Sequence, residues 1–147
     1  MAVYMNNKNQ QSEIKRLFLA CKYSAQGFKA CYKSEAAFKL EVRLTLILLP
    51  LGCFLGESPI EKVLLITPIF IVLIVEMLNS AIEAAVDRIS AEQHELSGFA
   101  KDVASAAVAL SLIIFLMTWL IILLESALSI NRCIAIFLTR SRVQTSI

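Results

Sequence analysis

Residues 103–124, VASAAVALSLIIFLMTWLIILL, contain no charged side chain, and their only hydroxyl groups belong to Ser105, Ser111 and Thr118. As an α-helix this stretch extends roughly 33 Å, which is enough to cross the hydrocarbon core of a bilayer. A span of this kind in a chain of 147 residues predicts a small membrane protein with a single domain.

The overall composition points the same way. Hydrophobic residues make up 58% of the chain and charged residues 18%, with a mean hydropathy of +0.71. A soluble domain of this size could not bury so much apolar surface, and a disordered chain is far less hydrophobic. The net charge of +2 is too small to suggest a nucleic-acid partner. The four cysteines include no C-x-x-C pair, and the polar start at residues 1–13 predicts no signal peptide.

Two further membrane spans are predicted, at residues 63–86 and about 36–56. A capping box, Ser58-Pro59-Ile60-Glu61, predicts that a helix starts just before the first of them. The 36–56 segment is weaker, because its charged side chains must reach the interface: Lys39, Glu41 and Arg43. A second capping box is predicted at residues 90–93, and Ser97-Gly98 is predicted to break the chain before the last span.

Residues 13–33 have a different pattern, that of a basic amphipathic helix. Apolar residues at spacings of three and four form one face: Ile14, Leu17, Phe18, Cys21, Ala25 and Phe28. Lysines form the other face: Lys15, Lys22, Lys29 and Lys33. Such a helix is predicted to lie on an anionic membrane surface, and a helix of a soluble bundle is the alternative.

The distribution of Lys and Arg predicts the orientation. Eight of these residues precede residue 44, whereas the loop between the first two spans holds Lys62 alone. The positive-inside rule therefore places the N-terminus in the cytoplasm. The predicted fold is all-α, with three transmembrane helices and an N-terminal surface helix in one domain, residues 1–124. Residues 125–147 form a C-terminal tail without an assigned role.

The candidate site is a polar stripe on the 63–86 helix, made of Glu76, Asn79, Glu83 and Asp87. At about 100° per residue they fall within an arc of about 80°. A carboxylate as deep as Glu76 is costly and is functional by default, although it could also bond a neighbouring helix. Glu76 suits proton transfer, and the shallower carboxylates suit a hard cation such as Mg²⁺.

No soluble-kinase motif accompanies the stripe: the sequence has no Walker loop, H-R-D or D-F-G set. The polar segment at residues 94–102 contains the only His and a Lys, which suit a phosphate site or a solvated loop.

Several motifs resemble the bacterial integral-membrane diacylglycerol kinase family. They are IVEMLNSAIEAAVDR at residues 74–88, EAAF at 35–38, HELSG at 94–98, AKD at 100–102 and SAAV at 105–108. The resemblance covers about residues 14–124. It implies a homotrimer in the bacterial inner membrane that phosphorylates diacylglycerol with ATP and Mg²⁺, giving phosphatidic acid.

The resemblance also implies roles for particular residues. It implies Glu76 as the general base, with Asn79 beside it, and Glu35 and Glu83 as Mg²⁺ ligands that hold ATP. Other residues match nucleotide contacts: Arg16, Tyr23, Glu92, His94, Lys101 and Asp102. Lipid contacts are implied for Phe38, Glu41, Glu76 and Ser105. Phe99 departs from the family, which commonly has Arg there.

Three alternatives remain at this point. An undecaprenol kinase of the same family would share the polar stripe. A small transporter would use an intramembrane carboxylate, but it needs a path open on both sides. A non-catalytic protein would use the stripe to join subunits.

Overall fold

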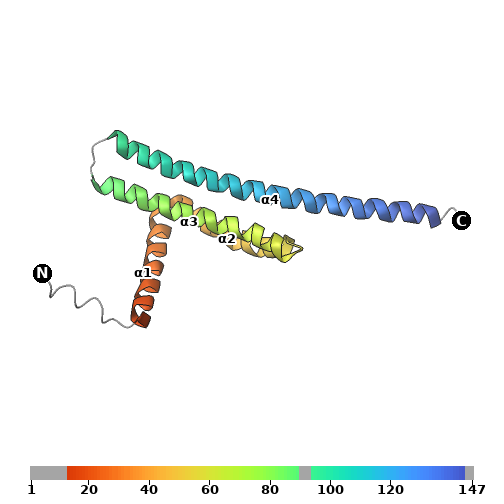
Figure 1. Ribbon diagram of the computed structural model, residues 1–147, viewed down its shortest axis with the longest axis horizontal. Helices are drawn as coiled ribbons and strands as arrows, with labels where there is room; N and C mark the ends of the chain where they lie inside the picture. The colour runs from red at the N-terminus through yellow and green to blue at the C-terminus, as the bar shows by residue number, and fades with distance from the viewer. Residues whose placement is uncertain (1–12, 90–93, 145–147) are drawn as a thin grey trace.

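Within the residues that the structure describes, 13–89 and 94–144 with side chains up to 129, the chain forms four α-helices. Figure 1 shows this computed structural model. The helices are α1 (Glu13–Ser34), α2 (Ala36–Leu55), α3 (Pro59–Ile89) and α4 (Glu95–Gln144). α3 and α4 form a long antiparallel hairpin, α2 lies along α3, and α1 leaves the bundle at a steep angle (Figure 1).

The connections follow from local sequence. Glu35 alone separates α1 from α2, with extended backbone angles of φ −97° and ψ 121°. The predicted capping box is confirmed: the Glu61 N–H donates to Ser58 Oγ at 3.2 Å, and Glu61 Oε2 accepts the Glu57 N–H at 2.9 Å. Gly56 is required in this turn, because a Cβ atom there would lie 2.9 Å from the backbone nitrogen of Lys62.

The predicted break at Ser97-Gly98 is wrong, because α4 starts at Glu95 and continues through both residues. His94 caps the helix, since its Nδ1 atom accepts the Leu96 N–H at 3.2 Å. Gly98 therefore lies in the first turns of the helix, where its cost of about 1 kcal/mol is tolerated. The second predicted capping box, at residues 90–93, lies outside the described residues. Residues 125–144 continue α4, and neither Gly nor Pro occurs between residues 99 and 144 to end it.

α3 lies at the centre of the bundle and contacts the three other helices. Its N-terminal half packs against α4 in a buried cluster of Leu65, Ile69, Trp119 and Ile122. The Trp119 Nε1–H donates to the carbonyl oxygen of Leu65 at 3.0 Å, so the indole is fixed within this cluster. Its other half packs against α1 and α2 in a second cluster of Cys31, Phe38 and Leu73.

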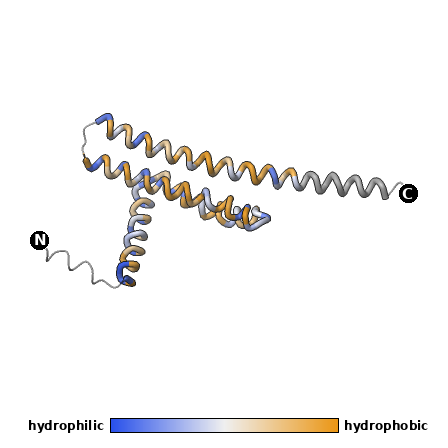
Figure 2. Tube along the Cα trace, in the orientation of Figure 1, coloured by the Kyte–Doolittle hydropathy of each residue, from blue (hydrophilic) through white to orange (hydrophobic). Residues whose placement is uncertain are grey.

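Two described helices, α3 and the Glu95–Ser129 part of α4, are long and apolar enough to cross a membrane. Only 17% of the apolar window of α4 is buried inside the protein, whereas the core helix of a soluble protein is mostly buried. Figure 2 shows that apolar residues cover these two helices along most of their length. The chain is therefore an all-α membrane protein. α2, which carries Lys39, Glu41 and Arg43, does not meet the same criterion, and its span remains a prediction.

We expect Trp119→Phe to weaken the contact between α3 and α4. The substitution keeps most of the apolar volume but removes the bond to the Leu65 carbonyl oxygen, so the free energy of unfolding should fall by about 1 kcal/mol. Unfolding in mixed micelles at increasing SDS, followed by circular dichroism, measures this loss. An unchanged midpoint would contradict a stabilising role for the bond.

Candidate active site

The predicted stripe lies on one side of α3 and becomes more exposed toward the C-terminal end of the helix. Glu76 is buried, with 6% of its surface exposed, whereas the Asp87 side chain is 66% exposed. Asn79 and Glu83 are partly buried between these extremes. A lipid-soluble group can therefore reach the inner end of the stripe, and a water-soluble group can reach the outer end.

Asn79 connects the two halves of the stripe. Its Nδ2–H donates to Glu83 Oε1 at 3.1 Å, which fixes the orientation of both side chains. The Oδ1 atom of Asn79 is buried and has no hydrogen-bond partner within the described residues. A buried amide oxygen without a partner is costly, so a hydroxyl group or a cation at this point would stabilise it.

Glu35 approaches the stripe from another part of the chain. It occupies the N-cap position of α2, but its carboxylate makes no capping bond and is left free for another role. Glu35 and Glu83 both interact electrostatically with Glu76. The fold thus brings Glu35, from the start of α2, near two carboxyl groups of α3, those of Glu76 and Glu83.

This donor set fits Mg²⁺, which prefers one or two carboxylates together with phosphate oxygens and water. Glu35 and Glu83 supply hard oxygen atoms, and both carboxyl groups lie near Glu76. Within the described residues no group of three or more His, Cys, Asp or Glu side chains could hold a metal ion. Protein ligands alone therefore do not complete a metal site in this part of the chain.

The water-facing end of the site is formed by α3 and α4 together. Lys101 on α4 forms a salt bridge with Asp87 on α3; the Asp87 side chain is largely exposed and that of Lys101 is partly exposed. Asp102 is exposed beside it, and His94 lies at the start of α4. Lys101 is therefore held near the outer carboxylates, where a phosphate group could reach it. Glu92 lies outside the described residues.

The remaining nucleotide candidates are not brought to this place within one chain. Arg16 and Tyr23 lie on exposed parts of α1. α1 contacts α2 and α3 but not α4, and no hydrogen bond or ion pair joins Arg16 or Tyr23 to the stripe in the described residues.

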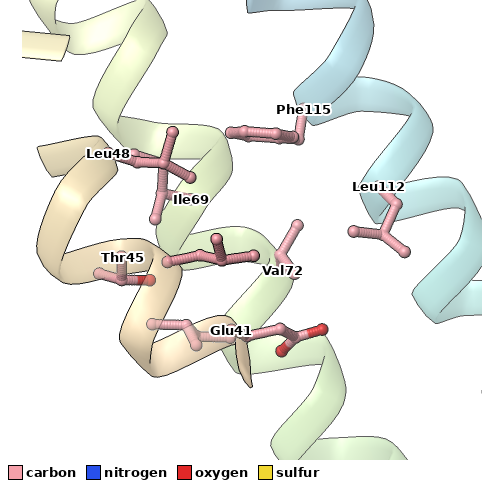
Figure 3. Close-up of a pocket in the computed structure, with 9 residues that line it drawn as sticks. Glu41, Thr45, Leu48, Ile69, Val72, Leu112 and Phe115 are labelled. Carbon is pink, nitrogen blue, oxygen red and sulfur yellow. The ribbon is translucent and has the colours of Figure 1, made fainter. Parts of the chain in front are cut away.

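The lipid candidates are divided between the core and the surface. Phe38 is fully buried, packing edge to face on Phe28 at 5.1 Å, and so offers no surface to a lipid in the single chain. Ser105 is exposed on α4. Glu41 lines a groove bounded by α2, α3 and α4 (Figure 3). Its carboxyl group interacts electrostatically with Glu76.

Sequence reasoning missed this groove and one of its residues, Thr45. Thr45 lies four residues after Glu41, so the two share a face of α2 and both line the groove. The spacing of a hydroxyl one turn from a carboxylate was the available signal. The helices that complete the groove could not be identified from spacing.

Comparisons with a family model and with individual known proteins identify the same family. Residues 22–123 match the family described as prokaryotic diacylglycerol kinase. The chain is 46% identical to a diacylglycerol kinase of Escherichia coli over 115 residues, which cover 78% of this chain and 94% of the relative. It is 50% identical to one of Haemophilus influenzae over 103 residues, or 70% and 87% of the two chains, respectively. It is also 46% identical to one of Pseudomonas aeruginosa over 114 residues, or 78% and 93%. The chain therefore belongs to the prokaryotic diacylglycerol kinase family.

Proposed function

We propose that this protein transfers the γ-phosphoryl group of ATP to the hydroxyl group of diacylglycerol, giving phosphatidic acid and ADP. The observation that carries the proposal is the burial gradient along α3, from the buried Glu76 to the exposed Asp87. A membrane alcohol and a water-soluble nucleotide can meet only where one polar stripe extends from the bilayer to water. Family membership supports the same reaction.

In this reaction Glu76 takes the proton of the lipid hydroxyl group. The hydroxyl oxygen then forms a bond to the γ-phosphorus, and the bond from that phosphorus to the β-phosphate oxygen breaks. Asn79, held by Glu83, orients the hydroxyl through its unpartnered amide oxygen. Proton removal by a positioned side chain contributes about 10²–10⁴-fold to such reactions.

Glu35 and Glu83 would hold Mg²⁺ with the ATP phosphates. When bound, this ion neutralises charge on the phosphate oxygens. Lys101 contributes a further positive charge beside them, and Asp87 limits the positions that its amino group can take. The other proposed nucleotide contacts are Arg16, Tyr23, Glu92, His94 and Asp102.

The proposed setting is the inner membrane of a bacterium, with the N-terminus in the cytoplasm. α2, α3 and α4 would each span the bilayer, and α1 would lie on its surface. Large apolar side chains of α1 are exposed, among them Ile14, Leu17 and Phe18, which supports this position. We further propose a homotrimer, whose contacts would cover part of the apolar surface of the bundle.

A lipid-phosphorylation assay tests the proposed function. Purified protein in mixed micelles with dioleoylglycerol, Mg²⁺ and ATP labelled at the γ-phosphate should give labelled phosphatidic acid. Undecaprenol in place of dioleoylglycerol should give little labelled lipid. Labelling of undecaprenol alone would replace the proposed substrate, and labelling of neither lipid would contradict a lipid kinase.

We expect Lys101→Met to raise the KM for ATP by about tenfold, because a charge-assisted contact to phosphate is lost. The KM for diacylglycerol should change little, since Lys101 lies at the water-facing end of the stripe. Lys62→Met, at the opposite end of α3, is the matched control and should leave both values unchanged. Equal changes in the two KM values would argue against a nucleotide contact.

A further inference from the structure

The groove beside Glu41 has a shape and lining suited to an acyl chain. It is a half-open groove with about 330 Å³ of empty space, part of which is continuous with the surroundings, and it is bounded by α2, α3 and α4 (Figure 3). Seven of its lining residues are apolar: Leu44, Leu48, Ile69, Val72, Leu73, Leu112 and Phe115. Only Glu41 and Thr45 are polar, and both come from α2.

Thr45 contributes a hydroxyl group to this groove that no residue of the described structure binds. The residue is buried, with 8% of its surface exposed, yet its hydroxyl group makes no hydrogen bond within the described residues. Three other hydroxyl groups of the bundle bond to their own helix: Ser80 to Glu76 O, Ser111 to Val108 O and Thr118 to Ile114 O. Glu41 Oε2 is also buried without a partner. Because the Thr45 hydroxyl lines the groove and has no hydrogen-bond partner in the described residues, it is available to a ligand there.

The position of Thr45 relative to Glu76 indicates which ligand group it would meet. Glu41 interacts electrostatically with Glu76, so these two carboxyl groups lie at neighbouring levels of the bundle. Thr45 is one helical turn further along α2, about 6 Å deeper in the proposed span. In diacylglycerol the ester carbonyl groups are a few covalent bonds from the reacting hydroxyl, a separation of about 5 Å. A polyprenol has only hydrocarbon at that distance.

We propose that Thr45 donates a hydrogen bond to an ester carbonyl oxygen of bound diacylglycerol, while one acyl chain lies in the groove toward Phe115. Thr45 is then a specificity residue that favours a glycerol ester over an alcohol without an ester group. The inference rests on the proposed function, because it concerns the lipid substrate of the same site. Glu41 remains beside the glycerol and does not contact the acyl chain.

The turnover test compares an ester with an ether. Thr45→Val keeps the shape of the side chain and removes its donor, whereas Thr45→Ser keeps the donor. For dioleoylglycerol, Thr45→Val should lower kcat/KM by about tenfold, and Thr45→Ser should restore most of it. For a dialkyl glycerol ether, which has no carbonyl group, the two variants and the unmodified protein should agree within about twofold. Equal losses for ester and ether, or no loss for either, would overturn the inference.

A binding measurement tests the same contact without turnover. Trp119 is the only tryptophan, and its ring lies 5.5 Å from that of Phe115, which lines the groove. Diacylglycerol with dibrominated acyl chains should quench its fluorescence, and unbrominated diacylglycerol should reverse the quenching by competition. Thr45→Val should raise the half-quenching concentration by about tenfold.

The two measurements separate failure of the inference from failure of the proposed function. If the unmodified protein makes no phosphatidic acid but Thr45→Val still weakens quenching, the proposed function fails and the Thr45 contact stands. If quenching does not depend on Thr45, the contact is overturned whether or not the protein is active. A changed oligomeric state of Thr45→Val, measured by light scattering, would assign the groove to a second copy of the chain and would also overturn it.

Discussion

Glu76→Gln is expected to reduce phosphatidic acid formation by about 10²–10⁴-fold while leaving the protein folded. Glutamine keeps the size of the buried side chain and can still form hydrogen bonds, but it cannot take a proton from the lipid hydroxyl group. Because Glu76 has no salt-bridge partner in the described residues, the substitution leaves no charge unpaired in the core. Initial rates with labelled ATP at saturating diacylglycerol measure the loss.

The matched control is Glu57→Gln, which changes the same chemical group at an exposed position just before the start of α3. Its rate should equal that of the unmodified protein. The oligomeric state of Glu76→Gln should also be unchanged, which separates a catalytic carboxyl group from one that joins subunits. Dissociation of the oligomer would support that structural role, and full activity would exclude Glu76 as the base.

The helix boundaries that the sequence predicted correctly depend on local interactions. The start of α3 follows from Ser58 and Glu61, which bond to backbone groups within one turn. α1 and α2 agree with their predicted ranges within about one residue. The start of α4 was missed because Ser97-Gly98 predicted a break, whereas the helix begins at Glu95, where His94 Nδ1 accepts the Leu96 N–H. The sequence assigned no structure to the tail after residue 124, whereas α4 continues to Gln144.

The candidate site was also predictable from the sequence only where it depends on a single helix. Glu76, Asn79, Glu83 and Asp87 lie on one helix, so helical periodicity alone predicted that they share a face. The approach of Glu35 to Glu76 was implied only by family resemblance, since it depends on how α1 and α2 meet above α3. The groove around Thr45 needs three helices, and spacing along one of them cannot predict it.

The second large effect is expected for Glu83→Gln, which should raise the Mg²⁺ concentration for half-maximal activity by at least about tenfold. Even residues that only support metal ligands cost this much when they are replaced. Glutamine retains an Oε1 atom that can accept the Asn79 Nδ2–H, so the bond between the two side chains can remain. The substitution therefore removes the charge at the proposed metal site while preserving the local geometry.

Titration of Mg²⁺ at fixed free ATP, with Glu57→Gln as the control, measures this effect. If Glu83 is a ligand, excess Mg²⁺ should recover much of the activity of Glu83→Gln, whereas Glu76→Gln should recover none. The two carboxyl groups lie two turns apart on α3, so this difference would separate proton transfer at the buried end from metal binding nearer water. Loss of activity in Glu83→Gln with an unchanged Mg²⁺ requirement would instead assign Glu83 to positioning Asn79, because their hydrogen bond is the other contact that the substitution could disturb.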